Sequence, residues 1–304
     1  MVGYENRQPP EGINVSREHP LRTFATLAIA AIVLVVATVA ALRLAGGVAA
    51  RQVPFEVERR IVSRIPIEFG DGADHPEAVA YLNELAGRLA AVMPLPEGMG
   101  VTVHYDPADT VNAFATAGGN LVFYRGLLER MPHENALAMV VAHEIAHVLH
   151  RDPLAALGGG VASTVALLVL TGNAGSAAAS EALNNAGLLT GMSFTRRMER
   201  AADEVAVEAL GRLYGHVDGA AALFELAAGE RGGGEPGEGE PGEGSEGRGG
   251  SGVRDLFERF ASTHPLDADR IEAIDELART RGIATEGETT PLPPAFGSWL
   301  DDDG

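Results

Sequence analysis

The pattern of hydrophobic and polar positions divides the chain into one long apolar run and several shorter periodic segments. The long run, FATLAIAAIVLVVATVAAL at residues 24–42, carries no charged residue over nineteen positions. A helix needs about 20 apolar residues to cross the hydrocarbon core of a bilayer. The run is also longer than the apolar region of a cleaved signal peptide, which is usually about 7–15 residues. The sequence therefore favours a retained transmembrane anchor over a cleaved signal.

Downstream of the apolar run, the spacing of hydrophobic residues predicts a helix, a strand and a hairpin. Within residues 73–93, apolar side chains recur at helical spacing. Residues 101–105 alternate apolar and polar positions, as a half-buried strand does. Residues 111–125, VNAFATAGGNLVFYR, consist of two β-prone runs joined at Gly118 and Gly119, which tolerate a positive φ. These two runs predict a β-hairpin.

Three further segments of the chain have helical character. The segment around VVAHEIAHVLHRD predicts a helix that begins near Glu134 and ends near His150, because a proline follows shortly afterwards. Residues 160–170, GVASTVALLVL, are apolar but short for a bilayer span, which favours a core helix over one that touches the membrane. Residues 193–215 form a more polar helical pattern that ends at Gly215, a typical C-cap.

These patterns divide the chain into an anchor, one folded domain and polar flanks. We expect a disordered N-terminal segment at residues 1–22, a transmembrane anchor at 23–46 and a folded domain at 53–282. Within that domain, the acidic and glycine-rich residues 230–252 cannot bury a core, and they predict a disordered insertion. Residues 283–304 contain several prolines and predict an extended tail.

Composition narrows the classes of function that the chain can have. Hydrophobic residues make up 46% of the 304 residues, which is enough for a sizeable core. The net charge is −19, so the chain lacks the basic character expected of a nucleic-acid-binding protein. Cysteine is absent, which excludes a disulfide scaffold and thiolate chemistry.

The predicted helix at residues 134–150 carries a metal-binding pattern, HEIAH. On an α-helix, residues four apart lie on the same face, about one turn apart. His143 and His147 therefore point the same way and can share one tetrahedral cation, while Glu144 stays close enough to reach an attacking water. Two histidine ligands with a glutamate base are typical of zinc hydrolases. The alternative is a helix with two hydrogen-bonded histidines and no metal.

A catalytic zinc ion takes three protein ligands, so a third ligand must be found. His150 lies on nearly the same face as His143, but three ligands from one straight helix surround a tetrahedral ion poorly. A second, crossing helix is geometrically easier, and MERAADE offers Glu199 as a ligand with Asp203 on the same face. Asp203 would then accept a hydrogen bond from a ligating histidine. The alternative for both acids is a solvated helix face beside arginines.

Four stretches in this order resemble the family of membrane-associated zinc metallopeptidases, or gluzincins, that includes the CAAX prenyl protease type 1 and the HtpX-like proteases. The stretches are NAFATAGG followed by VFYRGLL, then HEIAH, RRMERAADE and STHPLDADRI. The resemblance covers roughly residues 55–280. The chain departs from the HtpX pattern in its single predicted span and in the insertion before the His-Pro block. The closer analogue is therefore the single-anchor periplasmic branch, which includes the beta-barrel assembly-enhancing protease.

The resemblance implies both a fold and a set of site residues. The implied fold class is α+β and predominantly helical: a zincin-like (gluzincin) domain with a small β-sheet, preceded by one transmembrane helix. The implied cofactor is one Zn²⁺ per chain, held by His143, His147 and Glu199. Glu144 becomes the general base, and Asp203 becomes the carboxylate that orients a ligating histidine.

An extended peptide substrate is expected to bind along the first strand of the predicted hairpin. Backbone pairing of this kind gives affinity with little sequence preference. The residues expected to bind the peptide are Asn112, Ala113, Phe114 and Ala115.

The oxyanion that forms during peptide hydrolysis needs a hydrogen-bond donor in addition to the charge of the zinc ion. Three residues are candidates for this donor, Tyr214, His216 and His264. His264 lies in a break between predicted helices, where it could instead occupy the open zinc position as a latch. Packing or capping at that helix junction is the alternative for His264.

We expect a membrane-anchored zinc endopeptidase that hydrolyses envelope proteins, misfolded or misassembled ones in particular. The alternative is a zinc-bound chaperone or scaffold that holds unfolded envelope proteins, with hydrolysis secondary. An intact Glu144 favours the enzyme, since a binding protein has no use for that carboxylate. A CAAX-type processing protease is a weaker alternative because one span cannot build an intramembrane chamber. The expected partners are protein or peptide substrates and the bilayer around residues 24–42.

The expected location is a bacterial inner membrane, crossed once, with the catalytic domain in the periplasm. The periplasmic side follows from the resemblance to single-anchor relatives. The charge pattern points faintly the other way, because three arginines precede the span and five follow it within residues 43–64. Read by the positive-inside rule, this bias would place the domain in the cytoplasm.

Overall fold

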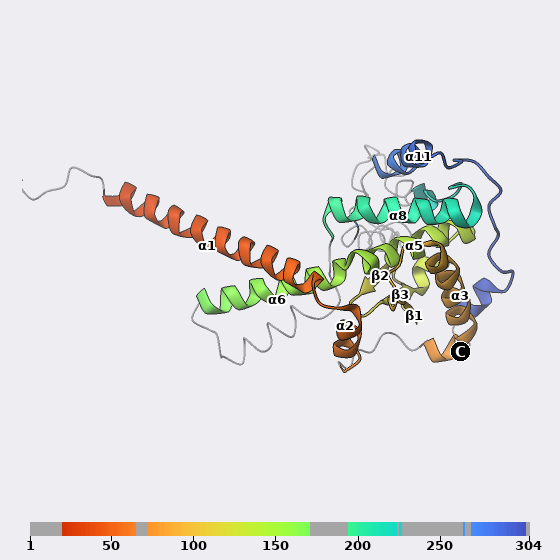
Figure 1. Cartoon of the computed structure of the whole chain (residues 1–304), viewed down its shortest axis with the longest axis horizontal. Helices are drawn as coiled ribbons and strands as arrows, with labels where there is room; N and C mark the ends of the chain where they lie inside the picture. The colour runs from red at the N-terminus through yellow and green to blue at the C-terminus, as the bar shows by residue number, and fades with distance from the viewer. Residues whose placement is uncertain are drawn as a thin grey trace, which may run out of the picture.

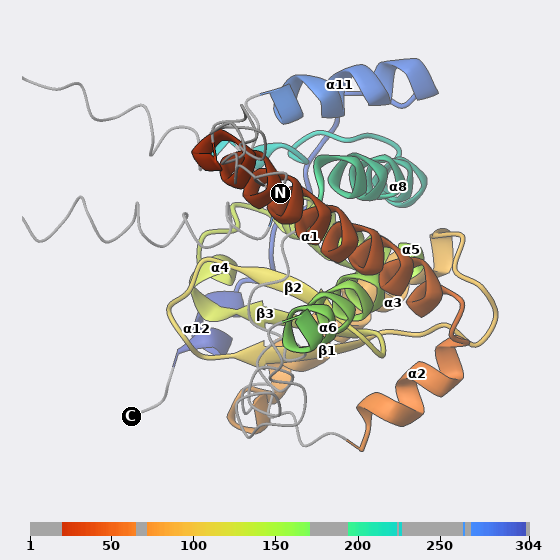
Figure 2. The same cartoon turned by 90° about the vertical axis from the view of Figure 1, so that its left-hand side faces the viewer.

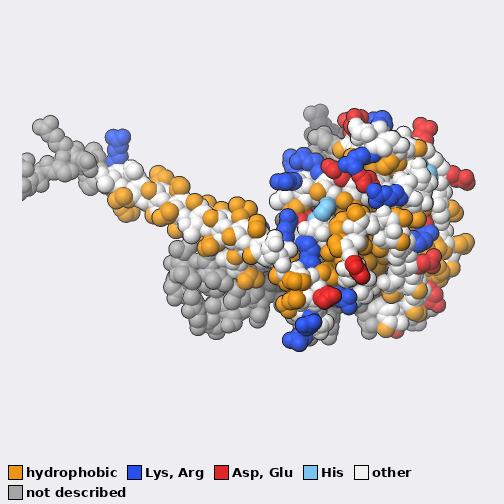
Figure 3. All heavy atoms as spheres, in the orientation of Figure 1, with side chains coloured by type: hydrophobic (Ala, Val, Ile, Leu, Met, Phe, Trp, Pro, Cys, Tyr) orange, Lys and Arg blue, Asp and Glu red, His pale blue; other side chains and the backbone are white. Residues whose placement is uncertain are grey.

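A long N-terminal helix, α1 (Pro20–Arg51), projects away from a mixed helix-and-strand domain (Figure 1). The computed structural model describes residues 20–64, 72–170, 194–223, 225–226, 264 and 269–301. Helix α1 is a candidate membrane span by length and composition: its most apolar stretch of 18 residues has a mean hydropathy of 2.7, and none of that stretch is buried against the rest of the protein. Figure 3 shows hydrophobic side chains along this helix, whereas charged side chains gather on the domain.

Helix α6 (Asp152–Leu170) leaves the domain and runs beside α1 (Figures 1 and 2). The two helices cross at glycines: a Cβ added at Gly46 would lie 2.5 Å from the carbonyl oxygen of Gly158. At Gly47, an added Cβ would lie 3.1 Å from the carbonyl oxygen of Ala155. Helix α6 therefore packs on the anchor helix through its turns at Ala155 and Gly158, whereas the sequence favours a core helix for residues 160–170.

The sheet consists of three strands in the order β1-β3-β2, with β1 (Thr102–Asp106), β2 (Ala113–Thr116) and β3 (Asn120–Tyr124). Strands β2 and β3 form an antiparallel hairpin, and β1 pairs with β3 in parallel. The hairpin turns at Gly118 and Gly119, whose φ angles are 86° and 82°. These values favour glycine, as the sequence predicts. Among the described strands, β2 pairs only with β3, so β2 is an edge strand.

Helix α5 (Glu134–His150) lies between the sheet and helix α8 (Arg196–Tyr214), as Figure 1 shows. Every residue of α5 from Glu134 to Val148 is buried. Helix α3 (Pro76–Val92) covers another side of α5, and the short helix α4 (Arg125–Leu128) follows β3. The largest fully buried side chains come from these elements and include Tyr105, Phe123, Leu82, Leu85, Leu137 and Leu210. Helix α5 is therefore the centre of the core.

Local signals fix the ends of the two helices that bear the predicted site. Helix α5 begins where His133 Nδ1 accepts a hydrogen bond from the Ala136 amide at 3.1 Å. It ends at Arg151, which adopts a left-handed conformation with φ 61°. Helix α8 begins at a Thr195 cap and ends at Gly215, with φ 83°. Both helices have the C-terminal ends that the sequence predicts.

The remaining helices pack around the domain, and the C-terminal segment docks on it. These helices are α2 (Phe55–Val62), the 3-10 helix η1 (Gly72–Asp74) and α11 (Asp269–Arg281). A short helix, α12 (Phe296–Leu300), lies within the expected extended tail. The Tyr105 hydroxyl donates a hydrogen bond to the carbonyl oxygen of Leu300 at 3.1 Å, which holds α12 against the sheet. Residues 1–19 and the predicted insertion at 230–252 lie outside the described residues.

Candidate metal centre

Two histidines from one face of α5 meet at a buried point. His143 is 5% exposed and His147 is fully buried, and their Nε2 atoms lie 3.0 Å apart. The two rings are nearly perpendicular, with centroids 4.6 Å apart. The four-residue spacing along α5 produces this convergence, because it stacks the two side chains one turn apart.

Glu199 reaches the same point from α8. Its Oε2 lies 3.4 Å from His143 Nε2, and its Oε1 lies 3.5 Å from His147 Nε2. The carboxylate is 2% exposed. The structure thus groups Glu199, rather than His150, with the two histidines of α5.

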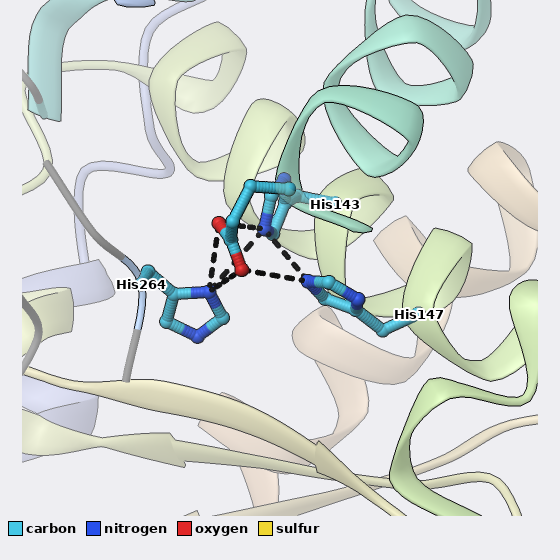
Figure 4. Close-up of side chains that lie close together, drawn as sticks. His143, His147 and His264 are labelled. Atoms are coloured by element: carbon cyan, nitrogen blue, oxygen red, sulfur yellow. Dashed lines mark hydrogen bonds and ion pairs between the residues drawn. The ribbon is translucent and has the colours of Figure 1, made fainter. Parts of the chain in front are cut away.

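His264 completes a cluster of four potential ligands (Figure 4). Its Nδ1 lies 3.2 Å from Glu199 Oε1 and 3.4 Å from His143 Nε2. One potential ligand atom from each of the four residues lies within 4.8 Å of the other three. Two ligands about 2.0–2.1 Å from one tetrahedral ion lie roughly 3.3 Å apart. The donor set and its spacings therefore fit a single zinc-sized cation.

His143 and His147 each contact a carboxylate through the ring nitrogen that faces away from the cluster. His143 Nδ1 lies 2.9 Å from Asp203 Oδ1, and His147 Nδ1 lies 3.0 Å from Asp152 Oδ2. Contacts of this kind fix the tautomer and leave Nε2 as the ligand atom. The sequence predicts Asp203 in this role, but Asp152 was missed. Its signal is the left-handed Arg151, which turns the chain so that Asp152 faces back towards His147.

Each of these two carboxylates is contacted by a different arginine. Arg270 of α11 is 6% exposed, and its Nη2 donates to Asp203 Oδ1 at 2.7 Å while its Nη1 donates to Glu199 Oε2 at 3.0 Å. Arg51, the last residue of α1, donates from Nη2 to Asp152 Oδ1 at 2.6 Å. We call His143, Asp203 and Arg270 the His143 relay, and His147, Asp152 and Arg51 the His147 relay. Sequence reasoning missed both arginines.

The electrostatics of the cluster favour a cation. Burial by itself lowers the pKa of His143, but its hydrogen bonds to Asp203 and Glu199 raise that pKa to about 10. Burial raises the pKa of Glu199, but contacts with His143, His147 and His264 hold it well below its usual range. Glu199 is therefore an ionised, buried carboxylate surrounded by imidazoles, an environment that suits a divalent cation.

Glu144 lies beside the cluster without a hydrogen-bond partner. Its side chain is fully buried, and neither carboxyl oxygen accepts a hydrogen bond from the part of the chain that the structure describes. His264 Nε2 lies 3.5 Å from Glu144 Oε1. Glu144 and His143 also line a small cavity with Met139, Val140, Ala220, Leu223 and Arg270. A buried carboxylate that faces a cavity is placed to accept a proton from a molecule that enters it.

The other residues singled out from the sequence lie in different surroundings. Asn112 precedes β2, and its carbonyl oxygen accepts a hydrogen bond from the Tyr124 amide at 3.2 Å. Ala113 and Ala115 are buried and Phe114 is half-buried on the edge strand. The two remaining candidates for the oxyanion donor contact other groups, since the Tyr214 hydroxyl donates to Glu134 at 2.8 Å and His216 Nε2 lies 3.2 Å from the Glu288 carbonyl oxygen.

Comparison with known proteins gives a family and several relatives. The model of peptidase family M48 matches residues 76–278. The chain is 36% identical to the beta-barrel assembly-enhancing protease of Escherichia coli (strain K12) over 115 residues, which cover 34% of this chain and 23% of that protein. Its Yersinia pestis counterpart is 33% identical over 150 residues, which cover 45% of this chain and 30% of that protein.

A third relative aligns over more of the chain. The mitochondrial metalloendopeptidase OMA1 of Schizosaccharomyces pombe is 27% identical over 241 residues, which cover 75% of this chain and 64% of that protein. The chain thus spans less than two thirds of the length of each of these relatives, and less than one third of the two bacterial ones.

Proposed function

This chain belongs to peptidase family M48, and on that premise we propose that it is a membrane-anchored zinc endopeptidase that cleaves envelope proteins. One observation carries the proposal: Glu144, a buried carboxylate that accepts no hydrogen bond from the described residues, adjoins a four-residue cluster that fits a single cation. A zinc site that served structure alone would have no use for this carboxylate, since burying it without a partner costs free energy.

In the proposed mechanism, His143, His147 and Glu199 would hold a zinc ion. Bound there, the ion would act as a Lewis acid that lowers the pKa of water and polarises a carbonyl group. Glu144 accepts the proton of the attacking water and then delivers it to the leaving nitrogen. Asp203 and Asp152 keep the two imidazoles in one tautomer, so that both Nε2 atoms remain directed at the same point.

His264 has two proposed roles at this site, as a donor to the oxyanion or as a latch on the fourth metal position. The 3.2 Å and 3.4 Å distances from its Nδ1 to Glu199 and His143 support the latch, because they match those between ligands of one ion. We expect His264→Ala to change both peptide cleavage and zinc affinity. If both remained at wild-type values, neither role would stand.

The proposed substrate is an extended segment of a misfolded or misassembled protein, paired with the edge of β2 that no described strand covers. The edge position of this strand, from Ala113 to Thr116, supports such pairing, as does the small size of Ala113 and Ala115. Strands of the sheet pass beneath the cluster in Figure 4. The printed name of the bacterial relatives, beta-barrel assembly-enhancing protease, supports an envelope substrate.

We propose that the domain is periplasmic, anchored in a bacterial inner membrane by α1. The likeness to the bacterial relatives supports this side, and the excess of arginines after the span opposes it. A reporter fused after Gly304 gives a direct test. An alkaline phosphatase reporter should be active and a green fluorescent reporter dark; the reverse result would place the domain in the cytoplasm.

The second candidate function is a zinc-bound chaperone that holds unfolded chains on β2 without hydrolysis. Glu144→Gln distinguishes the two, because the amide keeps the shape of the side chain but accepts no proton. We expect the purified full-length variant to bind one zinc ion per chain and to cleave no unfolded protein substrate. Full complementation of a deletion strain by the variant would favour the chaperone. Wild-type protein without stoichiometric metal would overturn both functions.

A further inference from the structure

We propose that Arg51, at the end of the anchor helix α1, is a positioning residue for the metal ligand His147. The inference rests on the proposed zinc site. It adds a dependence that the proposed function does not contain: tight metal binding requires the anchor helix to be packed against the domain. Arg51 itself touches neither metal nor substrate, since it acts through Asp152.

The contacts form an unbroken chain from the anchor to the ligand. Arg51 Nη2 donates to Asp152 Oδ1 at 2.6 Å, and Asp152 Oδ2 lies 3.0 Å from His147 Nδ1. Asp152 is 1% exposed, so these two contacts replace the water that would otherwise surround its carboxylate. A buried carboxylate that loses its cation is costly to keep in place, and it relieves that cost by moving. Such a movement would release the His147 ring from its orientation.

The arginine next to Asp152 in sequence does not substitute for Arg51. Arg151 is turned the other way: its Nη2 lies 2.6 Å from Glu58 Oε2 and donates to the Val53 carbonyl oxygen at 2.6 Å. The guanidinium of Arg151 also lies over the Phe55 ring at 5.4 Å. Arg151 therefore connects the C-terminal end of α5 to the segment after the anchor. The arginine that contacts Asp152 is Arg51.

The crossing of α1 and α6 determines where Arg51 lies. Asp152 is the first residue of α6, and Arg51 lies just beyond the glycines of α1 that contact α6. A Cβ at Gly46 would lie 2.5 Å from the Gly158 oxygen, and a Cβ at Gly158 would lie 2.6 Å from the Gly46 oxygen. Such close backbone contact fixes one helix against the other, in the way that small residues do between membrane helices.

The His147 relay differs from the His143 relay in the exposure of its arginine. The Arg270 side chain is 7% exposed and that of Arg51 is 41% exposed. Solvent screens an exposed ion pair, so Arg51 should contribute less than Arg270. This difference makes Arg51 the point at which the position of the membrane anchor can change the strength of metal binding.

The first test measures zinc binding by the full-length protein in detergent micelles, by competition with a chromophoric chelator. We expect Arg51→Gln to raise the Kd about tenfold, the lower end of the range for groups behind a metal ligand. Arg51→Lys should restore part of the affinity. Arg60→Gln is the matched control, since it removes the same charge from an exposed position of α2. Cobalt-substituted protein should show an altered d–d absorption spectrum for Arg51→Gln but not for Arg60→Gln.

A double-mutant cycle separates positioning from a general structural role. In the Asp152→Asn background, Arg51→Gln should raise the Kd no further, because the link it acts through is already broken. Two results would overturn the inference. One is a Kd for Arg51→Gln equal to that of Arg60→Gln. The other is a tenfold effect of Arg51→Gln that persists in full when Asp152 is replaced.

A second variant tests the helix crossing without changing any charge. Gly46→Leu should force α1 away from α6 and raise the zinc Kd, whereas Ala45→Leu places the same side chain on the exposed side of α1 and should leave the Kd unchanged. Thermal unfolding of the metal-free proteins shows whether either variant is misfolded. Equal Kd values for the two variants, both folded, would contradict the role of the crossing.

These outcomes are distinguishable from failure of the proposed function. A wild-type chain that binds zinc but cleaves no peptide bond would overturn the endopeptidase and leave the comparison of Kd values intact. An active enzyme whose Kd is indifferent to Arg51 would overturn the positioning role alone.

Discussion

Helix α5 carries two buried glutamates ten residues apart, and their surroundings are opposite. Glu134, in the first turn, accepts hydrogen bonds from the Tyr81 hydroxyl at 2.7 Å, from Arg88 at 2.5 Å and from the Tyr214 hydroxyl at 2.8 Å. Glu144, in the middle of the helix, accepts none from the residues that the structure describes. Glu134 thus has three hydrogen-bond donors, whereas Glu144 has none in the part of the chain that the structure describes.

The difference teaches how a structural polar cluster is told from a functional one. A satisfied buried network stabilises a fold, and burial of an unpartnered carboxylate opposes it. Burial raises the pKa of Glu134, but hydrogen bonds from Tyr81, Arg88 and Tyr214 bring it below its usual value. Glu134 thus stabilises the fold, whereas the burial of Glu144 opposes it, and the proposed role of Glu144 as general base would account for that cost. Four predictions test this contrast, from the largest expected effect to the smallest.

Replacing Glu144 should separate activity from stability most strongly. We expect Glu144→Gln to lower the kcat for an unfolded protein substrate about 10³-fold, as loss of a general base does. The variant should unfold at the wild-type temperature or above, because an amide is less costly to bury than an unpartnered charge. A markedly lower Tm, measured by thermal unfolding of the metal-free protein, would show that Glu144 has structural partners after all.

Replacing Glu134 should have the reverse effect. Glu134→Ala removes the acceptor of three hydrogen bonds and should lower the free energy of unfolding by about 3 kcal/mol. Zinc affinity should stay at the wild-type value, since Glu134 lies at the far end of α5 from His147. Denaturant titration and chelator competition measure the two quantities. A zinc Kd that rises together with the loss of stability would show that the Glu134 cluster and the metal cluster are energetically coupled.

The contribution of Glu134 should also depend on pH in a defined direction. The folded-state pKa lies below the usual value of 4.5, so the stabilisation is fully present above that value. It is lost as the pH falls from 4.5 through the folded-state pKa. The Tm difference between the wild type and Glu134→Gln should therefore be constant between about pH 6 and 8 and shrink in acid. A difference that grows on acidification would contradict the sign.

The smallest effect is expected for Tyr214, which the sequence offers as an oxyanion donor. Because its hydroxyl donates to Glu134, Tyr214→Phe should destabilise the protein by about 1 kcal/mol and leave kcat/KM unchanged. His216→Gln serves as the companion variant, since His216 contacts the Glu288 carbonyl oxygen instead. A fall in kcat/KM without a change in Tm would support a role for Tyr214 as the oxyanion donor instead.

Much of the fold could be predicted because its signals are local. The Gly118–Gly119 turn, the C-terminal end of α5 and the Gly215 cap each depend on a few neighbouring residues. The placement of α6 could not be predicted. Its apolar composition suits a domain core and an anchor helix equally, and only the glycine contacts with α1 decide between them.

The candidate site divides in the same way. The spacing of His143 with His147, and of Glu199 with Asp203, is a property of single helices, so it can be inferred from the sequence. Arg270 and Arg51 act across distances of 67 and 101 positions in the chain, and hydrophobic periodicity carries no information on such pairs. Asp152 lay five positions from His147 but needed a left-handed residue, Arg151, to reach it.

The burial of α5 from Glu134 to Val148 has a consequence for how the protein can move. A helix enclosed by the sheet, α3 and α8 exposes its amides to solvent only when the whole domain opens. Hydrogen–deuterium exchange should therefore be slowest along α5, slower than at the edge strand β2. Substrate entry and release must then be accommodated by the elements around α5, which stays fixed as a rigid frame through the catalytic cycle.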